Sequence, residues 1–307
     1  MRLRIPILLA TLIALVGSAA WAETAPDASG LFVDCRGERT ASPTVILESG
    51  AFGTSADWDR VLTDLSAKGR VCAYDRAGVG DSPPRSGGEG VAPIAQELAA
   101  LLDRLGETRP VILVGHSNGA LYVETFAAMY PSRVAGLVYV NGVTSNDIDD
   151  PVLLRYLSEE RCLSNLAAFA GELGLAPLVA PIVVGAEGLS REAAKRKRRA
   201  LTRVHSLIVA RDEDRAITPG LAVTQNLGGA PARIPVVVIV GETYPDAFSS
   251  REWTAAETLA AARAERAWIL KADGATHVSP LSRDRAYVIA GVDWLRSLAL
   301  PGPDVGH

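Results

Sequence analysis

The sequence has few of the residue types that most often bind metals or carry redox chemistry. Its 307 residues include three cysteines and four histidines, and the histidines are too scattered to have metal-ligand spacing. No C-x-x-C pair and no phosphate-binding G-x-x-x-x-G-K loop occurs. We therefore expect a protein that needs no cofactor and holds no metal.

An excess of charge of one sign is also missing. The formal net charge is only −4, so we expect no surface that binds nucleic acid. The basic run at residues 195–199 is expected to be an exposed helix face. No repeat or low-complexity tract divides the chain. With 48% hydrophobic residues it can bury the core of one enzyme-sized domain.

The first 22 residues have the pattern of a secretory signal peptide. Arg2 and Arg4 precede an apolar segment at residues 5–16, and residues 20–22 (AWA) form a cleavage site. The apolar segment is too short to span a bilayer comfortably, and no cysteine follows it for a lipid anchor. We expect an exported, periplasmic or secreted protein without a stable membrane anchor, with an uncleaved anchor as the alternative.

The most informative motif is G-x-S-x-G at residues 115–119 (GHSNG). The apolar, β-branched run at residues 111–114 is typical of a strand covered on both faces, and residues 120–130 have helical spacing. Glycines at both ends allow a sharp turn that exposes the Ser117 hydroxyl at the helix N-terminus. The motif predicts a nucleophile elbow with Ser117 as the nucleophile.

A serine nucleophile needs a base, and His277 is the best candidate among the four histidines. His116 lies inside the elbow and is expected to be a packing residue. His205 follows the basic run on an expected solvated helix, and His307 ends the chain. His277 stands in the loop expected after the last strand, where it could take the proton of Ser117.

Strand and helix patterns alternate along the chain, which predicts a mainly parallel sheet flanked by helices. Between the strands expected at 135–141 and 235–241, the sequence has helical patterns and no clear strand. The other expected strands are 31–35, 44–49, 70–75, 111–116 and 267–271. The expected helices are 55–68, 91–106, 119–130, 251–266 and 283–298.

Together with residues 45–53 and 74–82 (YDRAGVGDS), the elbow resembles the α/β-hydrolase superfamily, in particular exported bacterial serine hydrolases of the esterase or proline-peptidase kind. Ser49 replaces the usual histidine of the H-G-x pattern. The resemblance implies an α/β-hydrolase fold with a helical cap. Its core would be residues 23–144 and 229–307, and its cap residues 145–228.

The resemblance also bears on the cysteines and on the residues around the serine. Exported relatives imply a Cys35–Cys72 disulfide that leaves Cys162 as the odd thiol; three free thiols are the alternative. The superfamily implies an oxyanion hole formed by the backbone N–H groups of Ala51 and Asn118.

The triad acid is ambiguous. The superfamily usually has an aspartate three residues after the glycine that here is Gly241, and this chain has Tyr244 there. We expect Asp246 to be the acid, with Glu242 and Asp147 as alternatives.

These residues predict a serine hydrolase that cleaves a carboxylic ester or related small-molecule acyl substrate through an acyl-enzyme. The alternatives are an acyltransferase or perhydrolase, a proline-releasing peptidase, and a non-catalytic binding protein. Epoxide-hydrolase chemistry is disfavoured, because those relatives have aspartate where this chain has Ser117. No charged cluster in residues 145–228 identifies the substrate, and the sequence leaves the oligomeric state open.

Overall fold

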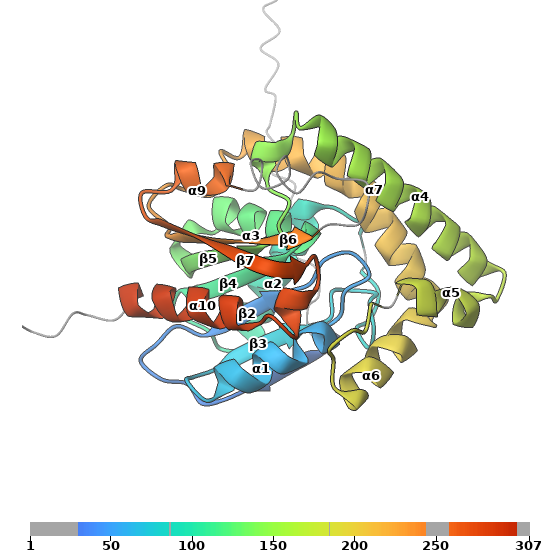
Figure 1. Ribbon diagram of the computed structural model, residues 1–307, viewed down its shortest axis with the longest axis horizontal. Helices are drawn as coiled ribbons and strands as arrows, with labels where there is room; N and C mark the ends of the chain where they lie inside the picture. Colours follow the sequence, from blue (N-terminus) through green and yellow to red (C-terminus); the bar gives the residue numbers. More distant parts are fainter. Residues whose placement is uncertain (1–29, 86, 184, 244–257, 300–307) are drawn as a thin grey trace, which may run out of the picture.

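The computed structural model describes residues 30–85, 87–183, 185–243 and 258–299. Seven strands form one sheet in the order β1-β3-β2-β4-β5-β6-β7, with only β1 antiparallel to its neighbour (Figure 1). This confirms the predicted fold class. The strands are β1 (Val33–Arg36), β2 (Val45–Glu48), β3 (Val71–Tyr74), β4 (Val111–His116), β5 (Val134–Val140), β6 (Val236–Thr243) and β7 (Ala267–Thr276).

Helices cover both faces of the sheet, which explains the continuous apolar strand runs. Ile46 of β2 packs on the side of α2 and α3, whereas its neighbours Val45 and Leu47 pack on the side of α1 and α10. The core helices are α1 (Asp59–Ser66), α2 (Val91–Arg104), α3 (Asn118–Met129), α9 (Leu259–Arg263) and α10 (Ala286–Ala299). Short 3-10 helices are η2 (Ser55–Trp58), η3 (Pro131–Arg133), η4 (Ser145–Asp147) and η5 (Ser279–Leu281).

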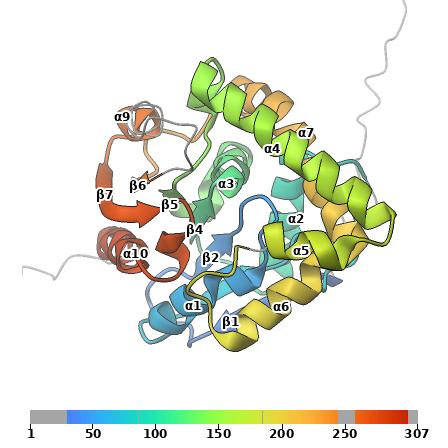
Figure 2. The ribbon, with the colours of Figure 1, turned by 45° about the vertical axis from the view of Figure 1, so that its right-hand side comes forward.

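Four helices between β5 and β6 form a layer beside the core, which we call the cap (Figure 2). They are α4 (Pro151–Glu172), α5 (Ala176–Val183), α6 (Arg191–Leu201) and α7 (Val204–Asn226). The antiparallel pair α4 and α7 is long, and α7 continues through Pro219. Within the part of the chain that the structure describes, no helix is long and apolar enough to cross a membrane.

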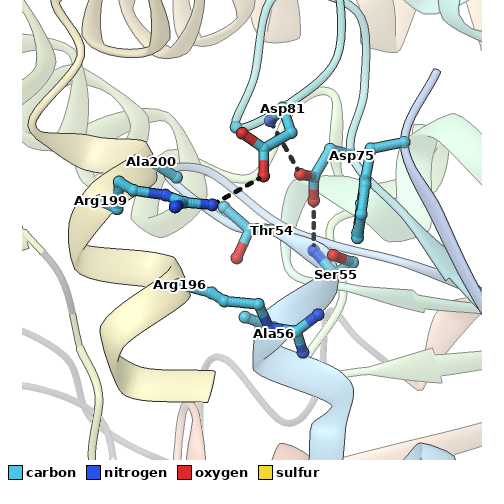
Figure 3. A pocket seen from close by; sticks show the side chains of 10 residues that line it. Thr54, Ser55, Ala56, Asp75, Asp81, Arg196, Arg199 and Ala200 are labelled. Atoms are coloured by element: carbon cyan, nitrogen blue, oxygen red, sulfur yellow. Dashed lines mark hydrogen bonds and ion pairs between the residues drawn. The ribbon is translucent and has the colours of Figure 1, made fainter. Parts of the chain in front are cut away.

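The basic run at residues 195–199 attaches the cap to the core, so the prediction of a solvated face is wrong in part. Lys197 is buried and its ammonium lies 2.5 Å from a carboxylate oxygen of Asp57. Arg199 reaches Asp81 at 3.4 Å across a small crevice between α6 and the core (Figure 3). Lys197 and Arg199 of the run therefore pair with acidic residues of the same chain.

A disulfide between Cys35 and Cys72 joins the antiparallel pair β1 and β3, where the two residues are direct cross-strand partners. This confirms the pairing that the exported relatives imply. Cys162, on α4, is an exposed free thiol.

Replacing both bridged cysteines by serine is expected to lower the free energy of unfolding by about 2–4 kcal/mol, because the bridge closes a 37-residue separation in the unfolded chain. Urea unfolding of the oxidised protein measures the loss. The Cys162→Ser variant is the control and should unfold like the wild type. An unchanged midpoint in the double variant would show that the bridge contributes nothing to stability.

Candidate active site

Ser117 occupies a strained turn between a strand and a helix. β4 ends at His116 and α3 begins at Asn118, and Ser117 between them has φ 52° and ψ −127°. A φ in this region is unusual for a residue other than glycine and is often found at functional sites. Ser117 is 3% exposed. The strand, sharp turn and helix thus have the arrangement that the G-x-S-x-G motif predicts.

Close packing explains both glycines of the motif. A Cβ on Gly115 would lie 2.5 Å from the carbonyl oxygen of Gly119, and a Cβ on Gly119 would lie 2.7 Å from that of Glu48. Neither separation is sterically possible, so any larger residue would push α3 away from β2 and β4.

The loop at residues 49–53, which we call the oxyanion loop, lies directly against the elbow. A Cβ on Gly50 would approach the Cβ of Ser117 to 2.8 Å. Asn118 is the first residue of α3, so its N–H belongs to the group at the helix N-terminus that lacks an intrahelical acceptor. The two predicted oxyanion donors, the N–H groups of Ala51 and Asn118, therefore belong to adjacent segments.

Ser49, which replaces the usual histidine of the superfamily pattern, anchors this loop. Its buried hydroxyl donates to the carbonyl oxygen of Thr54 and accepts from Nε1 of Trp58, both at 3.0 Å. The small side chain thus has both a donor and an acceptor role inside the core. The departure from the family pattern is compensated by these hydrogen bonds.

His277 follows the end of β7 and lies next to the elbow. Its backbone carbonyl accepts from Nε2 of His116 at 2.9 Å and from Nδ2 of Asn141 at 2.8 Å, and the two imidazole rings are 4.8 Å apart between centroids. Because a carbonyl only accepts, His116 carries a proton on Nε2. Asn141 also accepts from the N–H of Gly241 at 2.6 Å.

These contacts give two residues roles that the sequence did not reveal. His116, predicted to be a packing residue, also holds the backbone of His277. Asn141, at φ 45° after β5, connects the ends of β5, β6 and β7 at the edge where His277 lies. Both side chains support the segment that carries the proposed base.

Burial keeps both histidines neutral. It lowers the pKa of His277 to about 3, with the neighbouring His116 adding to the effect, and it lowers the pKa of His116 to about 4. A neutral imidazole is the form that can accept a proton from a serine.

If His277 is the base, kcat/KM for an ester should be level from pH 8 down to the ordinary histidine range. It should fall only below about pH 6.5, the pKa of an unperturbed imidazole, because the folded protein binds the proton less readily than free histidine. Initial rates between pH 4 and 9 measure this. An acid limb centred at or above pH 7 would contradict it.

The three candidate acids differ in how far the structure describes them. Asp147 lies in η4, where one carboxylate oxygen accepts from the N–H and hydroxyl of Thr144 at 2.8 and 3.0 Å, and burial raises its pKa to about 6. Glu242 is the last residue but one of β6, and the structure does not describe its side chain. Asp246 lies outside the described residues, so the triad acid stays a prediction.

The cap places two carboxyl groups beside the elbow. Nδ2 of Asn118 donates to Asp214 of α7 at 3.4 Å, and Glu160 of α4 lies close enough to Asn118 for that side chain to affect its pKa. Burial raises the pKa of Glu160 to about 7, and burial with repulsion from Glu160 raises the pKa of Asp214 to about 8. Tyr156, on α4 one turn before Glu160, has its ring centroid 6.5 Å from that of His277.

Sequence reasoning missed this pair because its members lie on separate cap helices and meet only in the fold. Because burial and their mutual repulsion raise both pKa values above the usual carboxyl range, the pair holds a proton more readily than free carboxyl groups do, and a protonated carboxyl can donate as well as accept hydrogen bonds. Within the described ranges, no group of three or more His, Cys, Asp or Glu residues could hold a metal ion.

Comparisons with known proteins agree with this architecture. A family profile described as alpha/beta hydrolase fold matches residues 43–166. A protein named as a carbamate hydrolase, RutD, of Pantoea ananatis is 39% identical over 102 residues, which are 33% of this chain and 37% of RutD. An AB hydrolase superfamily protein of Gibberella zeae is 34% identical over 139 residues, 42% of each chain. The chain thus spans less than half the length of these curated relatives.

Solved structures match over most of the chain. A thermophilic esterase from Thermogutta terrifontis superposes with a TM-score of 0.64 at 20% identity, covering 88% of this chain and 94% of the esterase. At this identity the likeness shows the fold. The sheet order, the elbow and these matches together show that the chain has the α/β-hydrolase fold.

Proposed function

We propose that this protein is a serine hydrolase that cleaves a carboxylic ester or related acyl substrate, with Ser117 as nucleophile and His277 as base. The observation that carries the proposal is the position of Ser117, the single residue of the strained turn between β4 and α3. The backbone carbonyl of His277 is hydrogen-bonded to His116, the residue before Ser117. The named activities of the relatives, carbamate hydrolysis and ester hydrolysis, are both acyl chemistry.

The mechanism follows from these roles. Ser117 Oγ attacks the acyl carbon while His277 accepts its proton, and His277 then protonates the leaving alcohol. Water, activated by the same base, releases the acid from the acyl-enzyme. The N–H groups of Ala51 and Asn118 stabilise the oxyanion, each contributing about 3–4 kcal/mol in the transition state. Asp246 orients His277 and stabilises its imidazolium. An acyltransferase or perhydrolase would form the same acyl-enzyme and pass the acyl group to an acceptor other than water.

A second candidate, a proline-releasing peptidase, is favoured by the cap pair Glu160 and Asp214. A peptide amine carries a positive charge, and two carboxyl groups beside Asn118 could ionise against it. An ester without an amine has no such partner for the pair. Substrate preference therefore distinguishes the two candidates.

We expect p-nitrophenyl acetate and butyrate to be turned over faster than prolyl p-nitroanilide, because the roles assigned to Ser117 and His277 require only an acyl carbon. Initial rates with each substrate, with KM determined separately, measure the difference. Faster turnover of the prolyl substrate, lost in Asp214→Asn, would favour the peptidase. Turnover of neither class would leave the binding-protein alternative.

We further propose that the protein is exported. The disulfide between Cys35 and Cys72 fits an oxidising compartment, and residues 1–22, which lie outside the described part of the chain, have the pattern of a signal peptide. N-terminal sequencing of the protein recovered from the periplasm or medium should begin at Glu23.

A further inference from the structure

We propose that Arg76 is a positioning residue for the oxyanion hole, and that through Glu213 it makes the hole depend on the docked cap. The inference rests on the proposed function, because an oxyanion hole matters only if an acyl group reacts at Ser117. Arg76 follows β3 in the D-R-A-G segment and is 3% exposed. Neither the elbow nor the candidate triad includes it.

The contacts of Arg76 converge on the oxyanion loop. Its Nη1 donates to the carbonyl oxygen of Ser49 at 2.6 Å, and its Nη2 donates to the carbonyl oxygen of Gly50 at 3.1 Å. Nη1 also donates to Glu48 of β2 at 2.6 Å. One planar guanidinium thus holds the end of the strand and two successive peptide groups of the loop.

These two bonds, together with the N–H of Gly53 that also donates to the Gly50 carbonyl at 3.1 Å, fix where the loop directs its N–H groups. The peptide bonds of the described residues are trans, so the C=O and N–H of each peptide group point in opposite directions. With the Gly50 carbonyl turned toward Arg76, the N–H of Ala51 in the same peptide group points away from Arg76. Since Gly50 packs against the Cβ of Ser117, this arrangement is suited to an N–H directed at the reaction site.

The other side of the guanidinium binds the cap. Nε and Nη2 of Arg76 donate to the two carboxylate oxygens of Glu213 on α7, both at 2.7 Å. Glu213 is 2% exposed, so this bidentate pair is shielded from water and its geometry is rigid. The loop is therefore connected to α7 through one side chain.

A second contact between the loop and α7 supports this connection. Phe52, at a strained φ of 52°, lies in an apolar cluster with Leu207 and Ala210 of α7. Leu207, Ala210 and Glu213 are spaced by three residues, so they lie along one side of the helix. The same side of α7 thus packs near Phe52 and pairs with Arg76. This packing explains why Phe52, a bulky residue, is held in an unfavourable backbone conformation.

Arg85 offers a matched control. It is another arginine with an almost fully buried side chain, and it forms a bidentate pair with Glu97 at 2.5 and 2.8 Å. Its charged partners are Glu89, just before α2, and Glu97, within α2, and neither belongs to the oxyanion loop or to the cap. Arg85→Lys therefore reports what loss of a buried bidentate pair does by itself.

The test compares Arg76→Lys and Arg85→Lys in the full chain, using p-nitrophenyl butyrate and a butylboronic acid that forms a tetrahedral adduct with the serine. Arg76→Lys should lower kcat by roughly 10²–10³-fold, as loss of one oxyanion donor does, with KM changed less than about threefold. Its boronic acid affinity should fall with kcat. Arg85→Lys should keep wild-type kcat and boronic acid affinity, and thermal unfolding shows whether each variant is folded.

Glu213→Gln extends the test to the cap and substitutes for Arg76→Lys if that variant does not fold. It leaves the bonds of Arg76 to Ser49 and Gly50 available, and we expect a smaller loss of kcat at unchanged KM. If folded Arg76→Lys keeps the kcat and boronic acid affinity of the wild type, the inference is overturned. Where Arg76→Lys does not fold, the same result in Glu213→Gln overturns it. In both cases ester turnover by the wild type still supports the proposed function. A wild type that neither cleaves the ester nor binds the boronic acid would overturn the proposed function itself.

Discussion

Ser117→Ala should lower kcat for p-nitrophenyl butyrate by on the order of 10⁶-fold, the loss expected when a triad nucleophile is removed. Alanine deletes only the hydroxyl, and it is no larger than serine in a turn where φ is 52°. The buried position should therefore remain packed. Steady-state rates of the purified variant, checked against its circular dichroism and thermal midpoint, measure the loss.

Ser297→Ala is the control for this variant. Ser297 is an exposed serine on α10 whose hydroxyl donates to the carbonyl oxygen of Trp294, and its loss should leave kcat unchanged. Equal activity of the Ser117→Ala variant and the wild type would remove Ser117 from the mechanism. His277→Ala with full activity would likewise remove the proposed base.

Asp246→Asn should lower kcat by up to roughly 10⁴-fold, because an amide in place of the triad aspartate stabilises the wrong histidine tautomer. The expectation rests on sequence: Asp246 lies five residues after Gly241, two beyond the usual place, and Pro245 between them can bulge the loop. The variant should lose kcat across the whole neutral pH range, and its pH profile measures this.

Glu242→Gln and Asp147→Asn are the matched controls for the acid. Both should keep kcat within a few-fold of the wild type, although Asp147→Asn should also lower the thermal midpoint, because Asp147 caps η4 through Thr144. A large loss of kcat in Glu242→Gln instead would identify Glu242, near the end of β6, as the triad acid. A large loss of kcat in Asp147→Asn at an unchanged thermal midpoint would identify Asp147, in the segment after β5, as the triad acid.

The core of the fold could be predicted because local patterns determine it. The strand at residues 111–116 was expected from an apolar β-branched run and is β4 with the same bounds. Gly115 and Gly119 marked the elbow because only glycine fits where α3 crosses the ends of β2 and β4. The Cys35–Cys72 bridge followed from the resemblance, and the antiparallel register of β1 and β3 explains it.

The site beyond the elbow could not be read in the same way, because its contacts join distant segments. Arg76 and Glu213 are apart in sequence and pair only when α7 docks on the core. The sequence predicted only a packing role for His116. Its bond to the His277 carbonyl depends on the length of β7, which continues to Thr276 beyond the predicted end at 271. Lys197 similarly finds Asp57 only after the cap is placed.

Labelling with a fluorophosphonate, followed by peptide mapping, tests the central claim most directly. The probe reacts covalently with a serine that an adjacent base activates, and it needs no knowledge of the natural substrate. The account predicts a single modified peptide, bearing the label on Ser117, and no label in the Ser117→Ala variant with its fold intact. Labelling of another serine, or none where a control hydrolase reacts, would contradict it and favour a binding protein on this fold.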